Sequence, residues 1–244
     1  MGAAPVAGTL SARTVKTILR ALADPKRAVS SAWFFKTGPG QYGEGDRFLG
    51  ITVPEQRKVA RQHRGLPLAE VAVLLASPIH EDRFTALEIL VMQYESGDAK
   101  ARESVFRFYL QHTDRINNWD LVDTSAAYIV GEHLRVRSRA RVYRLARSKS
   151  LWERRIAMVA TATWIAEGDT ADAYAIADLL LEDTHDLIRK AVGWMLREAG
   201  VQDRAVLLRF LRSHYARVSR TTLRYAIEHL PVAQRKRVLA GNLA

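Results

Sequence analysis

HDLIRKAVGWMLREAG, residues 185–200, has the apolar spacing of an amphipathic helix. Wound as a helix, the segment has on one side an apolar stripe suited to a protein core: Ile188, Ala191, Val192 and Met195. The opposite side carries a tryptophan between two cations: Lys190, Trp194 and Arg197. This second face is either a surface tryptophan covered by cationic stems or a platform for an anionic ligand.

Similar helix signals recur along the chain, and convincing strands do not. Thr52-Val53-Pro54-Glu55 and Ser150-Leu151-Trp152-Glu153 have the pattern of capping boxes. Prolines stand where helices should begin, at Pro67, Pro78 and Pro231, and glycines where they should end, at Gly97, Gly168 and Gly200. We predict an all-α fold with helices over residues 52–65, 81–96, 119–134, 151–167, 171–181, 185–199 and 203–215.

From residue 79 onward the longer helices begin at intervals of about 35 to 40 residues, which is typical of HEAT or armadillo-like helix pairs. Such pairs stack into a curved solenoid, and we expect a concave basic groove; a non-repetitive helical bundle is the alternative. We expect one domain over residues 1–244, with residues 1–10 disordered.

Residues 36–46, KTGPGQYGEGD, interrupt the helical pattern and predict a Gly-rich loop over 36–47. Gly38, Gly40 and Gly43 match a dinucleotide fingerprint by letter, but no strand precedes them and no βαβ unit follows. The loop is either a plain connector or a place where backbone amides approach a phosphate.

The chain is strongly basic, with 37 Lys and Arg against 26 Asp and Glu and a formal net charge of +11. Such a balance favours a polyanionic partner, nucleic acid first, although a generally arginine-rich proteome would give the same balance. The absence of Cys excludes disulfides and thiolate metal sites. The histidines lack metal-ligand spacing, so we expect no metal and no cofactor. No secretory signal and no apolar run of ~20 residues is visible, which favours a cytoplasmic protein without a membrane partner.

Asn117-Asn118-Trp119-Asp120-Leu121-Val122-Asp123 places an indole and a carboxylate one helical turn apart. Asp123 borders an apolar stripe, where an ionised carboxylate needs a partner cation or a function. Arg155 borders a second apolar face beside Trp152. Asp123 and Arg155 therefore form either a buried structural ion pair or part of one functional surface.

Four motifs carry a resemblance to a known family: Phe48-Leu49-Gly50-Ile51 with Pro54 and Arg57, Trp119-Asp120-x-x-Asp123, Trp152-x-x-Arg155, and Ile188-x-Lys190-Ala191-x-Gly193-Trp194-x-Leu196-Arg197-Glu198. With these motifs, the chain resembles the AlkD-like DNA alkylation repair family, the HEAT-repeat DNA glycosylases. The resemblance runs from about residue 15 to about residue 230. Phe34-Phe35-Lys36, before the Gly-rich loop, is also similar to a subgroup of this family.

The resemblance implies a monofunctional glycosylase that acts in base excision repair. Its implied partner is duplex DNA, and its implied lesions are cationic alkylpurines such as 3-methyladenine and 7-methylguanine. Asp123 would be the catalytic carboxylate, with Trp119 and Trp194 flanking the lesion and Arg155 holding the backbone nearby. The other implied or expected DNA contacts are Lys190, Arg197, Phe34, Lys36 and Arg220, the last at a helix start after Ser219.

One position departs from the family pattern, because Phe34 stands where relatives have a tyrosine near the cleft. The ring is kept and the hydroxyl contact is lost. A monomer that associates with the nucleoid when bound to DNA is expected. The rival hypotheses are a non-catalytic HEAT-repeat protein that binds DNA structures and a HEAT-type scaffold for acidic partners.

Overall fold

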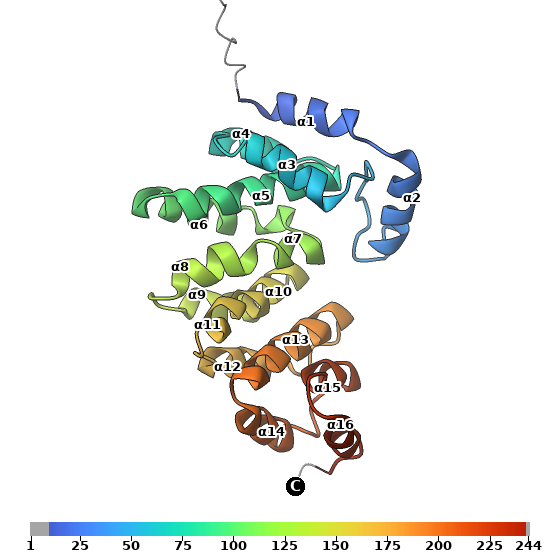
Figure 1. Cartoon of the computed structure of the whole chain (residues 1–244), viewed down its shortest axis with the longest axis vertical. Helices are drawn as coiled ribbons and strands as arrows, with labels where there is room; N and C mark the ends of the chain where they lie inside the picture. The colour runs from blue at the N-terminus through green and yellow to red at the C-terminus, as the bar shows by residue number, and fades with distance from the viewer. Residues whose placement is uncertain (1–9, 243–244) are drawn as a thin grey trace, which may run out of the picture. The chain divides into compact units, whose positions relative to one another are not determined.

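The computed structural model describes residues 10–242 as a helical protein (Figure 1). Within this range no β-strand forms, and the single extended contact is an isolated parallel bridge between Arg47 and Ile79. The predicted all-α class is confirmed. Residue contacts divide the chain into two compact units, one ending at Leu121 and the other beginning at Val122. The single repeat domain expected from the sequence stays a prediction, and the disorder expected for residues 1–10 falls, except for Leu10, outside the described residues.

The first unit is built around its longest helix, α5 (His80–Ser96), which is buried over most of its length. Four helices pack against α5: α1 (Ala12–Ala21), α3 (Val53–Gln62), α4 (Leu68–Leu75) and α6 (Ala99–Gln111). A short 3-10 turn, η1 (Thr113–Arg115), follows α6. At the start of α3 the Glu55 carboxylate accepts the Thr52 amide at 3.0 Å, as the capping pattern predicts, and it also accepts the Thr52 hydroxyl at 2.6 Å.

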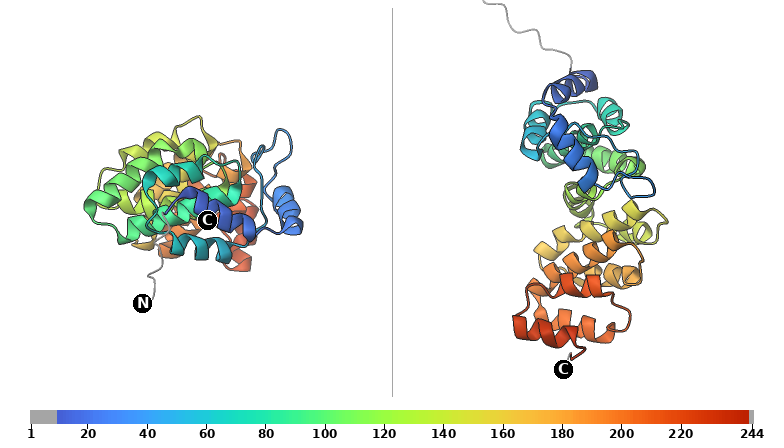
Figure 2. Two further views of the ribbon diagram at one scale, coloured as in Figure 1. Left: turned by 90° about the horizontal axis from the view of Figure 1, so that it is seen from above. Right: turned by 90° about the vertical axis from the view of Figure 1, so that its right-hand side faces the viewer.

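The helix α2 (Pro25–Phe34) has no buried residue, although Asp24 caps its first turn. With the Gly-rich loop it lies at the edge of the first unit (Figure 2). The loop is made of turns, and its glycine amides bond within the loop: Gly38 to Gln41 Oε1 at 3.0 Å and Gly40 to Glu44 Oε2 at 2.8 Å. These internal acceptors favour the plain connector over a phosphate cradle.

The expected helix over residues 119–134 is interrupted. It begins as α7 (Trp119–Asp123), turns at Thr124, and continues as a π-helical turn, η2 (Ala127–Gly131), and α8 (Glu132–Leu134). Carbonyls of the wide turn accept side-chain donors from α11: Ala127 from the Thr163 hydroxyl at 2.7 Å and Gly131 from the Trp164 indole at 2.8 Å. These tertiary bonds give a physical reason for the departure from a regular helix.

The second unit continues with α9 (Ala140–Ala146), α10 (Leu151–Ala160), α11 (Ala162–Ala166), α12 (Ala171–Leu180), α13 (Asp186–Gln202), α14 (Arg204–Ser213), α15 (Arg220–Ala226) and α16 (Val232–Leu239). α13 packs between α10 on one side and α15 on the other (Figure 1). Its predicted apolar stripe is buried, at Ile188, Ala191, Val192 and Met195.

One predicted helix is broken in the structure, and one predicted helix end is wrong. The helix expected over 151–167 breaks at Thr161, whose hydroxyl donates to the Met158 carbonyl at 2.7 Å. Gly200, at which the sequence predicts a helix end, lies inside α13, and it packs closely against α14: a Cβ there would meet Leu207 Cδ2 at 2.3 Å. In the part of the chain that the structure describes, no helix combines the length and hydrophobicity needed to cross a membrane.

Candidate functional site

Trp119 opens α7 at the end of a stack of rings in the first unit. Its indole stacks on Phe35 with centroids 5.4 Å apart and an interplanar angle of 18°, and Phe35 stacks on Phe48 at 5.0 Å. Phe48 in turn stacks on the His80 imidazole at 4.6 Å. Phe34 meets the indole edge-on at 5.9 Å. We call Trp119, Phe35 and Phe48 the Trp119 stack. Phe35 covers one face of the Trp119 indole, and the Trp119 side chain is half-buried.

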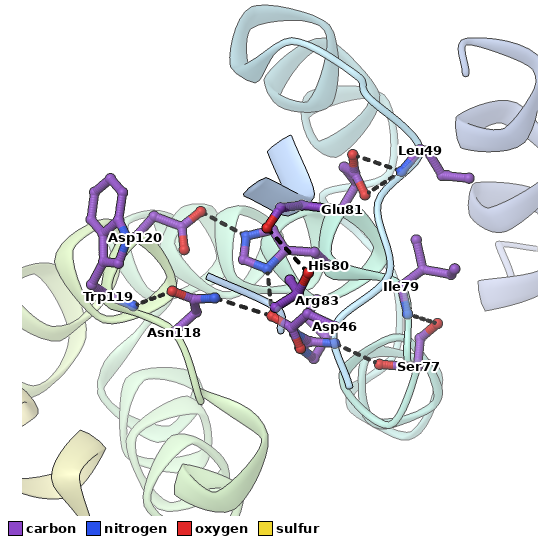
Figure 3. A network of polar contacts seen from close by, with 12 residues as sticks. Asp46, Leu49, Ser77, Ile79, His80, Glu81, Arg83, Asn118, Trp119 and Asp120 are labelled. Atoms are coloured by element: carbon purple, nitrogen blue, oxygen red, sulfur yellow. Dashed lines mark hydrogen bonds and ion pairs between the residues drawn. The ribbon is translucent and has the colours of Figure 1, made fainter. Parts of the chain in front are cut away.

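His80, which stacks on Phe48, also belongs to a buried polar cluster (Figure 3 shows the cluster). His80, at the start of α5, binds two carboxylates: Nε2 lies 2.7 Å from Asp120 Oδ2 and Nδ1 lies 3.2 Å from Asp46 Oδ2. Asp46 also accepts from Arg83 Nη2 at 2.6 Å and from Asn118 Nδ2 at 3.1 Å. We call these five residues the His80 network. Two carboxylates and two cations balance its formal charge when His80 is protonated.

Electrostatics favour the charged forms of this network. Burial lowers the pKa of His80, but the charge of Asp120 and the hydrogen bonds to Asp120 and Asp46 outweigh it and raise that pKa to about 9. Burial raises the pKa of the Asp46 carboxyl. The hydrogen bond from His80 and the charge of Arg83 outweigh burial and bring that pKa below its ordinary value. At neutral pH His80 is therefore an imidazolium held between carboxylates.

The neighbouring Glu81 carboxylate fixes the segment that follows the Gly-rich loop. It accepts the amides of Leu49 at 2.9 Å and Gly50 at 2.7 Å (Figure 3 shows the Leu49 contact). Gly50 has φ +81°, and a Cβ there would lie 2.2 Å from the Asp24 carbonyl oxygen. Only glycine fits this close crossing, which brings Phe48 into the Trp119 stack.

Asp123, at the other end of α7, belongs to the second unit. Arg155 of α10 grips its carboxylate with two hydrogen bonds, Nε to Oδ1 at 2.9 Å and Nη2 to Oδ2 at 2.7 Å. Arg155 also donates from Nη1 to the Leu187 carbonyl at 2.5 Å. The arginine side chain is 6% exposed and the aspartate side chain 20% exposed. The pair is therefore mostly buried on the cation side and reachable by solvent on the carboxylate side.

The remaining cations that the sequence predicts for DNA contact have local partners in the structure. Lys190 Nζ lies 2.8 Å from Asp186, and Arg197 pairs with Glu198 at 2.8 Å and with Glu228. Arg220 is exposed and donates to the Leu239 carbonyl at 2.8 Å. DNA phosphates would have to exchange with these partners.

The predicted aromatic residues are partly exposed. Lys36 sits over the Trp33 ring at 5.0 Å, beside Phe34, which is 55% exposed. Trp194 is half-buried and lines a depression of about 520 Å³ between α11 and α13. Ile165 and Glu198 also line this depression. Trp194 lies seven residues, about two turns, beyond Leu187, the residue that Arg155 contacts.

The family model for DNA alkylation repair enzymes matches residues 15–230 of this chain. The protein belongs to this DNA alkylation repair family. Its structure also resembles a solved predicted DNA alkylation repair enzyme from Enterococcus faecalis, with a TM-score of 0.67 and 15% identity over 86% of this chain and 97% of the other. At that identity the likeness shows the fold alone. No curated protein matches the sequence.

For this DNA alkylation repair protein, sequence reasoning found the Asp123–Arg155 pair but missed the His80 network. Asp120 and Phe48 stood inside motifs that were quoted for the resemblance, without a role. Asp46 and His80 carried no local signal, because their partners lie 34 to 72 residues away in the chain. Among residues 10–242, no group of three or more His, Asp or Glu side chains is arranged to hold a metal ion.

Proposed function

We propose that this protein is a monofunctional DNA glycosylase that hydrolyses the N-glycosidic bond of cationic N3- and N7-alkylated purines in duplex DNA. Membership of the repair family supplies the class of substrate. The observation that carries the proposal within the chain is α7, a five-residue helix with a stacked indole at one end and an arginine-gripped, partly exposed carboxylate at the other. The HEAT-like repeat with a concave basic groove is part of the same proposal.

The proposed reaction requires few catalytic groups from the protein. An alkylated purine already carries positive charge and leaves readily, so no strong general acid is needed. As the C1′–N bond breaks, the sugar becomes oxocarbenium-like, and a fixed negative charge beside it stabilises the transition state. Asp123 would supply that charge and orient the water that attacks C1′.

Arg155 orients the carboxylate that would do this work. It donates one hydrogen bond to each oxygen of Asp123, whose side chain stays 20% exposed. The grip holds the carboxylate in one orientation, and Arg155 itself is held by the Leu187 carbonyl. In this proposal Arg155 is a positioning residue first, since its side chain is 6% exposed.

Trp119 would select for charge. The face of its indole away from Phe35 would offer an electron-rich surface to a cationic nucleoside, worth about 0.5–2 kcal/mol for a good contact. A neutral base gains neither this contact nor the ease of departure, so selectivity requires no shaped pocket. Trp194, Lys190, Arg197, Phe34, Lys36 and Arg220 remain proposed DNA contacts.

The test is release of free base from duplex DNA that contains 7-methylguanine. We expect Asp123→Asn to slow excision by about 100-fold or more, because the fixed charge is lost, while duplex affinity stays close to that of the wild type. Asp183→Asn is the matched control: Asp183 pairs with Arg154, the residue next to Arg155, at 2.6 Å and lies outside the proposed site. Near wild-type excision by Asp123→Asn would show that the carboxylate is misassigned.

The second candidate is a DNA-binding protein without glycosylase activity. The observation that favours it is that both Asp123 oxygens already have a partner, as in a structural ion pair. This candidate predicts tight, salt-sensitive binding to methylated duplex with no base released above background by the wild-type protein.

A further inference from the structure

We propose that His80 is a positioning residue for Trp119: clamped between Asp46 and Asp120, it holds the indole in the orientation in which that ring meets the lesion. The contact between Trp119 and a damaged base rests on the proposed function. The mechanical part, that His80 sets the placement of Trp119, stands on the geometry of the first unit alone.

The polar contacts of His80 hold the backbone on both sides of Trp119. Asp120, the next residue, binds His80 Nε2 at 2.7 Å. Asn118, the preceding residue, donates to the same Asp46 that binds His80 Nδ1, and its Oδ1 accepts the Trp119 amide at 2.8 Å. The first turn of α7 is thus tied through one imidazole to α5 and to the end of the Gly-rich loop (Figure 3).

The ring contacts of His80 support the side chain. The imidazole stacks on Phe48 at 4.6 Å and lies 4.9 Å from Phe35, the ring that carries the indole. His80 therefore supports Trp119 by two routes, one through hydrogen bonds to its neighbours and one through the stack. The His80 side chain is 3% exposed in a close-packed interior, so a shift of its ring would disturb both the hydrogen bonds and the ring stack.

The composition of the network points to orientation more than to stability. Replacing a buried ion network by apolar side chains is often neutral or stabilising, so charge is a poor way to hold a core together. Here two polar atoms are also left buried without a partner, Asp120 Oδ1 and Arg83 Nε. An arrangement that leaves such atoms unsatisfied yet fixes directional bonds to both neighbours of one indole is suited to placing that indole.

The test compares His80→Gln with His63→Gln in the full-length protein. Both histidines are buried in the first unit, but the His63 ring bonds to the Val59 carbonyl at 2.9 Å, outside the network. The fluorescence of Trp119 is isolated as the difference between each protein and the same protein with Trp119→Phe. We expect His80→Gln to increase acrylamide quenching of Trp119 about twofold or more, and His63→Gln to leave it unchanged.

A second measurement compares the rate of excision with the affinity for DNA. We expect His80→Gln to lower the single-turnover rate of 7-methylguanine excision about tenfold, while the Kd for undamaged duplex changes less than twofold. Asp120→Asn keeps the shape of a side chain that is 16% exposed, and we expect the same pattern from it, which covers the case in which His80→Gln fails to fold.

The outcomes distinguish the two proposals. Unchanged Trp119 quenching in both His80→Gln and Asp120→Asn would overturn the positioning role, whatever the excision rates. A wild-type protein that releases no base refutes the glycosylase, while the fluorescence comparison still decides whether His80 places Trp119. Equal effects of His63→Gln and His80→Gln on quenching would show general loosening of the unit and also overturn the inference.

Discussion

The two ends of α7 are built in opposite ways. At the Trp119 end, each neighbour of the indole is tied into a buried network with a balanced formal charge, and the ring itself rests on a stack. At the Asp123 end, one arginine holds a carboxylate whose side chain remains 20% exposed. The first arrangement favours a fixed position. The second favours a charge that can still meet a ligand.

This difference follows from what each group would do. A ring that selects by contact needs a defined plane, and contact energy falls quickly when the plane tilts. A carboxylate that stabilises developing charge needs an orientation but also an open side. We therefore expect the larger loss of excision rate at the Asp123 end, and at the Trp119 end a smaller loss of rate together with changes in selectivity and in the pH dependence of stability.

Arg155→Gln should have the largest effect among the following tests. It removes the guanidinium that orients the partly buried Asp123 carboxylate. We expect the single-turnover excision rate to fall about 100-fold, since a small misplacement of a reacting group can cost that much. We also expect the free energy of unfolding to drop by about 1–3 kcal/mol, below the figure for a fully buried pair because Asp123 is partly exposed.

The matched control is Arg154→Gln, which replaces the neighbouring arginine of α10 and breaks its pair with Asp183. It should reduce stability by a similar or smaller amount and leave the excision rate within about twofold of the wild type. If both substitutions slowed excision equally, the Asp123 end would have no special place in the chemistry.

A pH experiment probes the Trp119 end without any DNA. The folded-state pKa of His80 is raised to about 9 from an ordinary 6.5, so its contribution to stability is complete below pH 6.5 and is lost as the pH rises toward and through 9. The charged groups that face the ring are Asp46, Asp120 and Arg83. We expect the wild type to lose on the order of 2 kcal/mol of unfolding free energy between pH 6.5 and 9.5.

Denaturant titrations across that range provide the measurement, and His80→Gln provides the comparison. The variant cannot release a proton from this position, so its stability should change less over the same interval. Parallel curves for the two proteins would show that His80 is not an imidazolium in the folded state.

The helices could be predicted from the sequence because the signals for a helix come from residues that are close together in the chain. Apolar spacing placed a helix over residues 185–199, and the structure has it at Asp186–Gln202. The errors came from contacts between distant residues. Gly200 lies inside the helix with Leu207 packed against it, and the helix after Trp119 is interrupted where Thr163 and Trp164 donate to its carbonyls.

The site divides in the same way. Asp123 and Arg155 were singled out because each places a charge at the edge of an apolar stripe, a pattern visible in the sequence. The sequence leaves a structural and a functional interpretation of the pair open, and the geometry combines them in an ion pair whose carboxylate side chain is 20% exposed. The His80 network could not be read, because it joins a loop, the start of α5 and the start of α7.

Trp119→Phe is the smallest and most specific test of the Trp119 end. A phenyl ring can keep the stack on Phe35 but has a weaker quadrupole than indole, so the contact with a cationic nucleoside loses a fraction of its ~0.5–2 kcal/mol. We expect the ratio of Kd values for undamaged and 7-methylguanine duplex to fall about two- to fivefold, with the affinity for undamaged DNA nearly unchanged. Trp33→Phe, at an indole that is 74% exposed in the same unit, is the control and should leave the ratio alone. An unchanged ratio in Trp119→Phe would mean that this fixed plane does not contact the charged base, and selectivity for cationic lesions would then have to come from their ease of departure at the Asp123 end.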